Sequence, residues 1–549
     1  MTRPDGTMEF VSLHHHTTFS NGDGHGSPLE HAQRADELNM WALGFTEHGN
    51  NSSHAAAEQA CNKYGIKPIF GIEAYGSPAI RETKYKRKTH QTILAMDQDG
   101  YHSLNRLVTQ SYKDFYQFPT VSWENLKENN KGLIVTSGCA SSLTSCKLLG
   151  GKFFGEERDS YSENDFEAML KVIKMYKRVF GDRYYLEVQR FPDLPRVCMI
   201  NQALEEASKL TGVPLLATAD VHYCQPHEGF IQQALHAAHR GDSVAGIGET
   251  WEYDIPLTFP ESDEEILDDL IATGLSEQSA RSAIANTSVV AERCTVVLPK
   301  SKPLVFPIPD YFDGTREEYL DEQIAAGIEY RAAYGKICDG PEYQERIKME
   351  LEVMKLKPEF IDYFLFLSDL ICWAKDTGIV VGPGRGSAAA SLVCYLLRIT
   401  EVDPITVPTM VFERFMDASR TDPPDIDIDI ADEDRWKLVT YLKEHYGYAN
   451  VGNVANIIRY RGKSALDKVG IIYRIPNAVL KPLKERISDR VETDERVDDS
   501  VADALATYSD DPGVAFLLEH HAEAMRVACE IEGDVQTFGT HAAGYVVSS

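Results

Sequence analysis

The first 225 residues alternate short apolar segments typical of β-strands with segments typical of helices. Strand-like segments include residues 41–48 (WALGFTEH) and 183–190 (RYYLEVQR), and residues 27–39 and 202–212 have helical patterns. This βα repetition predicts a parallel sheet or barrel, in which site-forming side chains stand at the ends of strands. After about residue 255 the pattern becomes mainly helical. The chain is therefore expected to be a multidomain α/β protein.

Length and composition narrow the class of protein further. With 549 residues, 43% of them hydrophobic and 25% charged, the chain exceeds what one core usually holds and has a globular composition. No apolar stretch approaches the roughly 18 residues of a membrane span, and the first ten residues lack a signal-peptide core. Ten scattered cysteines without a C-x-x-C pair indicate reduced thiols. We expect a cytoplasmic protein with no membrane partner.

The formal net charge of −29 disfavours nucleic-acid binding by the chain as a whole, because phosphate contacts need basic side chains. Two segments are locally basic. Residues 81–88 (RETKYKRK) have five basic residues and one acid, and residues 459–490 have nine Lys or Arg and three acids. Such runs are more often solvated charged faces than binding sites, so their neighbours decide between the two interpretations.

Residues able to bind metal stand at nearly every strand end of the first region. If residues 10–16 form a strand, His14 and His16 point to one face and His15 to the other. A lone buried histidine or cysteine is far more often a core residue than a ligand, so the recurrence at successive strand ends carries the prediction. Mixed imidazole and carboxylate donors suit zinc, manganese or iron, and such clusters activate water against phosphate esters. The nine candidates, enough for more than one ion, are His14, His16, Asp23, His48, Glu73, His90, Cys139, Asp220 and His222.

A second candidate site lies in residues 423–432 (PPDIDIDIAD), which alternate strictly. As a strand, this segment places Asp425, Asp427 and Asp429 on one face and three isoleucines on the other. Crowded carboxylates repel one another unless cations neutralise them, and hard oxygen ligands favour Mg²⁺. Paired Mg²⁺ ions serve in-line displacement at phosphorus. The alternative is a solvated acidic edge strand, but the isoleucines indicate a buried sheet.

A glycine-rich turn precedes this segment, in residues 381–391 (VGPGRGSAAAS). Backbone amides at such a turn form an anion site, and Arg385 and Ser387 add hydrogen-bond donors. The spacing fits neither a Walker motif nor a dinucleotide-binding fingerprint, and alone the turn is weak evidence.

At the nine candidate ligands the chain resembles the polymerase and histidinol phosphatase (PHP) domain that begins C-family polymerases. The resemblance implies a distorted (β/α) barrel in which all nine residues ligate a cluster of Zn²⁺, Mn²⁺ or Fe ions. It also implies a metal-dependent phosphoesterase, by resemblance a 3′–5′ exonuclease. The family more often has Asp at the position of Glu47, and little effect is expected because Glu47 is not one of the nine. The run 81–88 is expected near His90, where it could guide a DNA 3′ end.

The glycine turn, the FERF sequence at 412–415 and the PPDIDIDI sequence together resemble the palm of bacterial DNA polymerase III alpha subunits. The resemblance extends over essentially the whole chain. It implies a DNA-directed DNA polymerase that acts on a primer-template and deoxynucleoside triphosphates. By this match Asp425 and Asp427 hold two catalytic Mg²⁺ ions, Asp429 is structural, and the incoming triphosphate contacts Gly386, Ser387, Arg414 and Lys463.

The same resemblance implies an order of domains: a PHP domain at 1–265, the first part of a nucleotidyltransferase-like palm at 266–456, a helical thumb at 457–533, and the start of a returning palm segment at 534–549. The third catalytic aspartate of the family falls beyond residue 549, so polymerisation is expected to need a further segment or a second polypeptide. A fragment, half of a split polymerase and a degenerate product remain open. The alternative functions are a stand-alone phosphoesterase and a non-catalytic replisome assembly module.

Overall fold

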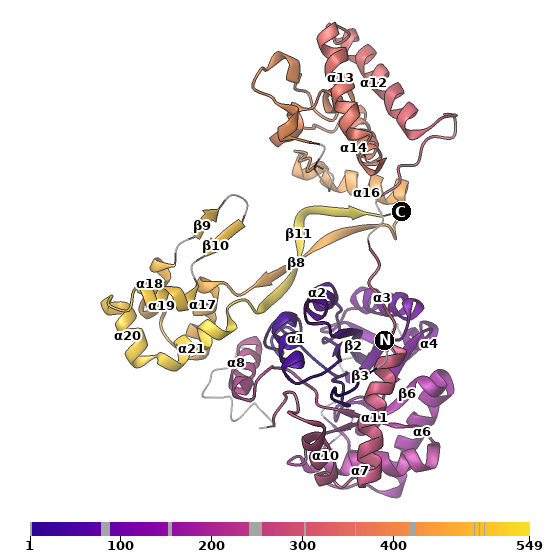
Figure 1. The fold of residues 1–549 in the computed structure, drawn as a ribbon, viewed down its shortest axis with the longest axis vertical. Coiled ribbons are helices and arrows are strands. Elements are labelled where there is room, and N and C mark those ends of the chain that lie inside the picture. Colours follow the sequence, from indigo (N-terminus) through magenta and orange to yellow (C-terminus); the bar gives the residue numbers. More distant parts are fainter. Residues whose placement is uncertain are drawn as a thin grey trace. The chain divides into compact units, whose positions relative to one another are not determined.

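The computed structural model describes residues 3–77, 88–151, 156–240, 255–300, 304–356, 358–417, 419, 424–487, 489–492, 495–498 and 500–548. These residues form two compact units (Figure 1). The first comprises Met1–Leu298 and Ile457–Gly539, and the second comprises Pro299–Asn456 and Thr540–Ser549. Of the basic run 81–88, only Lys88 is among the described residues.

The first unit is built on one mixed sheet, whose strand order is β1-β2-β3-β5-β6-β7, with β4 paired to β2. Only β3 runs antiparallel to both of its neighbours, β2 and β5. The interval between β2 and β3 is shorter than the about twelve residues that a parallel crossover needs, which explains this departure from the predicted parallel sheet. The strands are β1 (Ala42–Phe45), β2 (Lys67–Ser77), β3 (Thr89–Ala95), β4 (Thr120–Ser122), β5 (Leu133–Thr136), β6 (Tyr184–Gln189) and β7 (Leu215–Thr218).

Residues 10–16 are extended and join the two ends of this sheet. Ser12 and His15 accept hydrogen bonds from the backbone of Gly44 and Thr46, beside β1. On the other side, the His16 amide donates to the carbonyl of Val221, just beyond β7, at 2.7 Å. The predicted strand is thus a short bridging segment with one bridge pair, His15–Val221. Because it attaches to both ends, it curls the sheet toward the predicted barrel.

Helices surround these strands (Figure 1). Except for the helix Gly229–Arg240 (α8), they contribute buried residues that pack with the strands into the largest apolar core of the described chain. Several begin with the expected capping residues: Ser27 and Ser162 form capping boxes with Glu30 and Asp165. The helices are α1 (Pro28–Glu37), α2 (His54–Tyr64), α3 (Gln98–Lys113), α4 (Trp123–Glu128), α5 (Leu143–Leu149), α6 (Glu163–Phe180), α7 (Pro195–Thr211), α8 (Gly229–Arg240), α10 (Asp263–Ala272) and α11 (Glu277–Arg293).

The first unit extends further along the chain than residue 265. The carboxylate of Asp263, which begins α10, accepts hydrogen bonds from the amides of Glu9 and Phe10. On α11, Thr287 accepts a hydrogen bond from the Val11 amide at 2.9 Å. Both helices therefore fasten the N-terminal segment to the sheet, and the division between units follows Leu298.

A bundle of short helices between residues 457 and 533 belongs to the same unit. Residues of α8, among them Ile231 and Leu235, share one buried core with Leu466 of α17 and Val527 of α21. Strand β8 (Val451–Arg459) precedes the bundle in sequence and β11 (Val535–Val547) follows it, and the two strands pair with each other. Within the bundle region, β9 (Asp489–Glu492) pairs with β10 (Glu495–Asp498). The helices are α17 (Gly462–Ile472), α18 (Asn477–Arg486), α19 (Val501–Thr507), α20 (Pro512–His520) and α21 (Ala522–Ile531).

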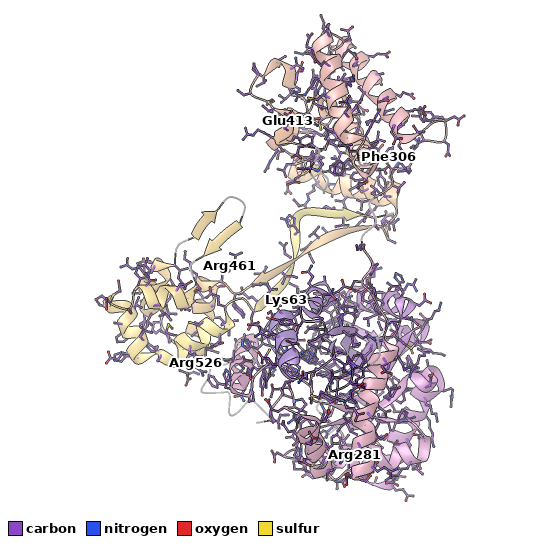
Figure 2. The ribbon with its side chains drawn as sticks, viewed as in Figure 1. Lys63, Arg281, Phe306, Glu413, Arg461 and Arg526 are labelled. Atoms are coloured by element: carbon purple, nitrogen blue, oxygen red, sulfur yellow. The ribbon has the colours of Figure 1, made fainter. Side chains whose placement is uncertain are left out.

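The second unit is mainly helical. Its core includes Phe306, which is labelled in Figure 2, together with Phe360 and Phe364. The buried carboxylate of Glu350 accepts hydrogen bonds from the amides of Leu392 and Val393 and so anchors the start of α15. The helices are α12 (Arg316–Ala333), α13 (Pro341–Met354), α14 (Pro358–Asp376), α15 (Leu392–Leu396) and α16 (Arg435–Tyr446).

Candidate metal centre and carboxylate face

All nine predicted metal ligands meet at one end of the sheet in the first unit. The side chains of His14 and His16 point into this cluster, whereas His15 points away and contacts His31 at 2.9 Å. The alternation predicted for residues 10–16 is therefore present. Asp23 and His48 come from loops, Glu73 and His90 from β2 and β3, and Cys139, Asp220 and His222 follow β5 and β7.

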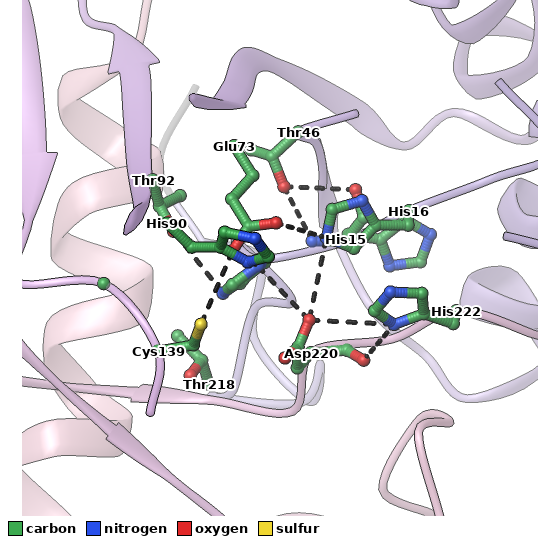
Figure 3. A network of polar contacts seen from close by, with 12 residues as sticks. His15, His16, Thr46, Glu73, His90, Thr92, Cys139, Thr218, Asp220 and His222 are labelled. Carbon is green, nitrogen blue, oxygen red and sulfur yellow. Dashed lines mark hydrogen bonds and ion pairs between the residues drawn. The ribbon is translucent and has the colours of Figure 1, made fainter. Parts of the chain in front are cut away.

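Glu73 is the centre of the cluster (Figure 3). Its carboxylate lies 2.7 Å from His48 Nδ1, 3.0 Å from His90 Nδ1 and 3.2 Å from His14 Nε2, and 3.6 Å from the sulfur of Cys139. Around it, Asp220 Oδ1 lies 3.2 Å from His14 Nε2 and 3.6 Å from His16 Nε2.

Asp23 completes the group on the other side of His48. Its carboxylate lies 3.0 Å from His48 Nε2 and 3.7 Å from His222 Nε2. Together with Glu73 and Asp220 it places three carboxylates among the imidazoles.

The arrangement fits bound cations. Several buried ligand atoms point inward and, among the described residues, contact one another without forming a hydrogen bond of regular geometry: His14 Nε2, His16 Nε2, His48 Nδ1, Glu73 Oε2 and Asp220 Oδ1. Buried polar atoms without partners are costly, and a metal ion satisfies them. Three groups of ligand atoms are close enough for one ion each: His16, His48 and His222; His14, His16 and Glu73; and His48, Glu73 and His90.

In three of the candidate ligand histidines, the ring nitrogen that faces away from the cluster contacts another group of the protein. His14 Nδ1 lies 2.6 Å from Glu187 Oε1, and His16 Nδ1 lies 2.8 Å from the Ser20 hydroxyl. His222 Nδ1 donates to the carbonyl of Asp220 at 2.8 Å. In all three rings Nε2 is left for a metal, as is typical of metal-binding histidines.

Glu187 is a functional residue that the sequence analysis missed. It stands in the middle of β6, is fully buried, and accepts hydrogen bonds from the hydroxyls of Thr92 and Thr218 at 3.1 Å as well as contacting His14. The signal was the single acid in the apolar strand YYLEVQ, because a carboxylate is rarely buried without a partner.

Glu47, where a departure from the family's Asp is expected to have little effect, contacts the cluster indirectly. Its buried carboxylate accepts hydrogen bonds from the hydroxyls of Ser20 at 2.6 Å and Thr17 at 2.7 Å. Because Ser20 in turn contacts the ring of His16, the Glu47 carboxylate fixes a metal ligand through one intermediate.

Electrostatics within the cluster favour cation binding. Burial raises the pKa of the Cys139 thiol, and the charges of Glu73 and Asp220 raise it further. This thiol therefore becomes a good ligand only when a cation stabilises the thiolate. Burial also opposes ionisation of Glu73, but the charges of His90, His14 and His48 outweigh it and hold the pKa of Glu73 well below its usual range.

A cavity of about 440 Å³ opens beside the cluster. Asp23, His48 and Glu73 are among the ligands that line it. Gln232 and Gln189 also line the cavity and donate to Asp23 at 2.9 Å and to Asp220 at 3.1 Å. The cluster is therefore open to a substrate from this side.

The carboxylate face of the second unit has the predicted alternation. Asp425, Asp427 and Asp429 are exposed, whereas Ile426 is buried and Ile428 packs against the same core. Among the described residues the segment forms no ladder; its one bridge pair is Val381–Ile430. The prediction of a strand in a buried sheet was therefore wrong in its pairing, because the isoleucines pack on helices.

The glycine-rich turn lies against this face. Arg385 Nε is 3.3 Å from Asp427, and its Nη1 is 3.4 Å from Asp429. A Cβ atom on Gly382 would lie 2.9 Å from the Cβ of Asp429, so the close approach requires glycine. Gly386 and Ser387 begin a short 3₁₀ helix, Arg414 ends another, and Lys463 belongs to α17 of the first unit.

The curled α/β sheet with a metal-ligand cluster at one end is the arrangement expected of a PHP domain. Residues 12–191 match the family model of that domain. Residues 318–549 match the model described as the bacterial DNA polymerase III alpha NTPase domain. The chain therefore contains a PHP domain followed by a DNA polymerase III alpha NTPase domain.

Curated relatives agree with this assignment. The chain is 30% identical to the DNA polymerase III subunit alpha of Aquifex aeolicus, over 99% of this chain and 48% of that protein. It is 32% identical to the subunit of Treponema pallidum, over 98% of this chain and 44% of that protein. It thus spans about half the length of the curated relatives it matches.

Among solved structures, a protein described as a metal-dependent phosphoesterase from Bifidobacterium adolescentis covers 40% of this chain, with 14% identity and a TM-score of 0.25. The helices in the described part of the chain include none with the length and apolar character of a membrane span.

Proposed function

We propose that the first unit is a metal-dependent phosphoesterase that removes nucleotides from DNA 3′ ends. The observation that carries the proposal is the convergence of unpartnered Nε2 and carboxylate atoms of His14, His16, Glu73 and Asp220 beside an open cavity. These ligands suit Zn²⁺, Mn²⁺ or Fe. Bound ions of this kind supply an activated water and polarise the phosphate ester.

The chain's own residues provide the positioning. Glu187 and Ser20 fix the rings of His14 and His16, so that both Nε2 atoms face the carboxylates of Glu73 and Asp220. Gln232 and Gln189 hold the carboxylates of Asp23 and Asp220, which lie at the cavity wall. A preorganised cluster of this kind costs little reorganisation when a phosphodiester enters.

The test is a gel assay with an end-labelled, 3′-mismatched primer-template and Mn²⁺. We expect the purified chain to shorten the primer, and His14→Ala to abolish the shortening. His102→Ala is the matched control, because His102 is exposed on α3 of the same unit. Shortening that survives in His14→Ala would exclude this cluster as its source.

We further propose that the second unit contributes the nucleotidyl-transfer site of a DNA-directed DNA polymerase. The exposed carboxylates of Asp425 and Asp427 support binding of two Mg²⁺ ions. The residues of the second unit that would contact a deoxynucleoside triphosphate on the primer-template are Gly386, Ser387 and Arg414.

Mn²⁺ binding tests this second proposal without requiring polymerisation. The paramagnetic ion bound beside Asp427 is expected to broaden the NMR signals of residues 425–430, and Asp425→Asn with Asp427→Asn is expected to abolish the effect. Exchange of Asp432, an exposed acid just beyond the segment, for Asn is the control. Equal broadening in all variants would contradict a metal site at this face.

A further inference from the structure

One wall of the cavity beside the metal cluster is apolar. Besides residues of the metal cluster, the lining of the cavity includes the apolar side chains of Phe191, Leu194, Val197, Ile255 and Leu257. These five side chains belong to one small apolar cluster, separate from the main core of the sheet. Leu194 and Ile255 are only partly buried, so they present the exposed surface of the wall.

The wall is fastened to the loops that carry the ligands. The His222 amide donates to the carbonyl of Leu257 at 2.7 Å, which links the wall to a metal ligand through one backbone hydrogen bond. Arg196, at the start of α7, donates to the carbonyl of Ala140, the residue after Cys139, at 3.3 Å. The distance between the wall and the cluster is therefore set by the backbone.

Three polar side chains that line the cavity are already engaged within the protein. Gln189 donates to Asp220 and accepts from the Ala140 amide, Gln232 donates to Asp23, and Arg196 donates to the carbonyls of Ala140 and Gly150. The wall therefore offers apolar contact rather than a set of hydrogen bonds matched to one base.

We propose that this wall binds the base of the 3′-terminal nucleotide while its phosphodiester lies at the metal cluster. The inference rests on the proposed phosphoesterase function and adds how its substrate is selected. The volume of about 440 Å³ lies within the roughly 300–1,000 Å³ typical of small-ligand sites. Every nucleobase has an apolar face, so the wall accepts all four bases and favours a 3′ end that is unpaired and can turn its base aside.

Binding of two small compounds separates the wall from the cluster. With Mn²⁺-loaded protein, isothermal titration calorimetry compares thymidine 5′-monophosphate with 2-deoxyribose 5-phosphate, which lacks the base. We expect the nucleotide to bind at least about tenfold more tightly, as is typical for the loss of one base contact.

Leu194→Ser and Ile255→Ser are expected to weaken nucleotide binding by about tenfold and to leave binding of the sugar phosphate unchanged. Leu210→Ser is the matched control, because Leu210 is exposed near the other end of α7. The wild-type chain is expected to shorten DNA that ends in an abasic 3′ residue about tenfold more slowly than DNA that ends in an intact nucleotide. Leu194 and Ile255 are both partly buried, so two separate variants are compared and a folding defect in one of them does not decide the result.

The outcomes distinguish the two proposals. Equal affinity for the two compounds, or an equal loss for both in the wall variants, overturns the base-binding wall while the phosphoesterase stands. If neither compound binds and no 3′ end is shortened, the phosphoesterase fails, and the wall fails with it.

Discussion

His25 Nδ1 lies 2.7 Å from the carboxylate of Asp534. The contact joins the loop that follows the metal ligand Asp23 to the residue that precedes β11. The same carboxylate accepts a hydrogen bond from the Gly26 amide at 3.2 Å, and the Val535 amide donates to the hydroxyl of Thr18. The helical bundle of residues 457–533 is thereby tied to the loop beside the metal cluster, within one unit.

This pair makes the stability of the first unit decrease as the pH becomes alkaline. Burial lowers the pKa of His25, but the charge and hydrogen bond of Asp534 outweigh it and raise the pKa to about 9. Because this value exceeds that of an unfolded histidine, about 6.5, the pair stabilises fully below about pH 6.5. Its contribution falls as pH rises through 9. We expect the free energy of unfolding of the first unit to fall by at most a few kcal/mol over this range, since one pKa unit corresponds to about 1.4 kcal/mol, and the Tm to drop with it.

The control is Asp534→Asn, which removes the charge and keeps the shape. In this variant the Tm between pH 6.5 and pH 10 is expected to vary less than in the wild type. Glu30 and Glu228 also raise the pKa of His25, so some dependence remains in the variant. Identical pH profiles for the two proteins would contradict a role for the pair.

Removal of metal is expected to destabilise the first unit. Without cations, the carboxylates of Asp23, Glu73 and Asp220 stay crowded and the unpartnered ligand atoms stay buried. A ligand that binds only the folded state stabilises it, so chelation should lower the Tm and restored Mn²⁺ or Zn²⁺ should raise it. Differential scanning calorimetry measures both steps. His14→Ala is expected to abolish the response, and an unchanged Tm on chelation of the wild type would contradict the metal centre.

Glu187→Gln is expected to weaken metal binding by about 10- to 100-fold, the effect typical of losing a carboxylate behind a ligand histidine. The amide keeps the shape but loses the charge that lies 2.6 Å from His14 Nδ1. Metal affinity is measured by competition with a chromophoric chelator. Glu206→Gln, at an exposed position on α7, is the control and should bind metal like the wild type. Equal affinity in Glu187→Gln would reduce Glu187 to a packing residue.

The metal cluster could be predicted because its information is local in sequence. His14 and His16 share a face by simple alternation, and Glu73, Cys139 and Asp220 lie on or just beyond strands that the apolar pattern reveals. That Asp425 and Asp427 share one face followed from the same alternation. In each case the direction in which a side chain points follows from the extended backbone of its own segment. It does not depend on which strand lies beside that segment.

What depends on distant partners could not be predicted. The direction of β3 is set by its short connection to β2, and the role of Glu187 by a histidine on another segment. Likewise, the apolar face of α8 gave no sign that it would share a core with Leu466, far along the chain. A periodic pattern shows that a face is buried but leaves its partner open.

Glu350 provides a last prediction, in the second unit. Its fully buried carboxylate accepts hydrogen bonds from Arg346 at 2.7 Å and from the amides of Leu392 and Val393, at the start of the helix that follows the glycine-rich turn. Glu350→Gln replaces an acceptor-only group by one that also donates, and it leaves Arg346 without its counter-charge. Loss of one partner from a buried ion pair costs about 3–5 kcal/mol.

We expect hydrogen exchange at the amides of Leu392 and Val393 to accelerate in Glu350→Gln, with the amides of β6 in the first unit unchanged. Glu345→Gln on the same helix is exposed and serves as the control. Because Ser391 also donates to Glu350, at 2.7 Å, loss of the carboxylate should release the chain that ends the glycine-rich turn. If exchange at these amides stays slow, α13 does not hold the turn in place.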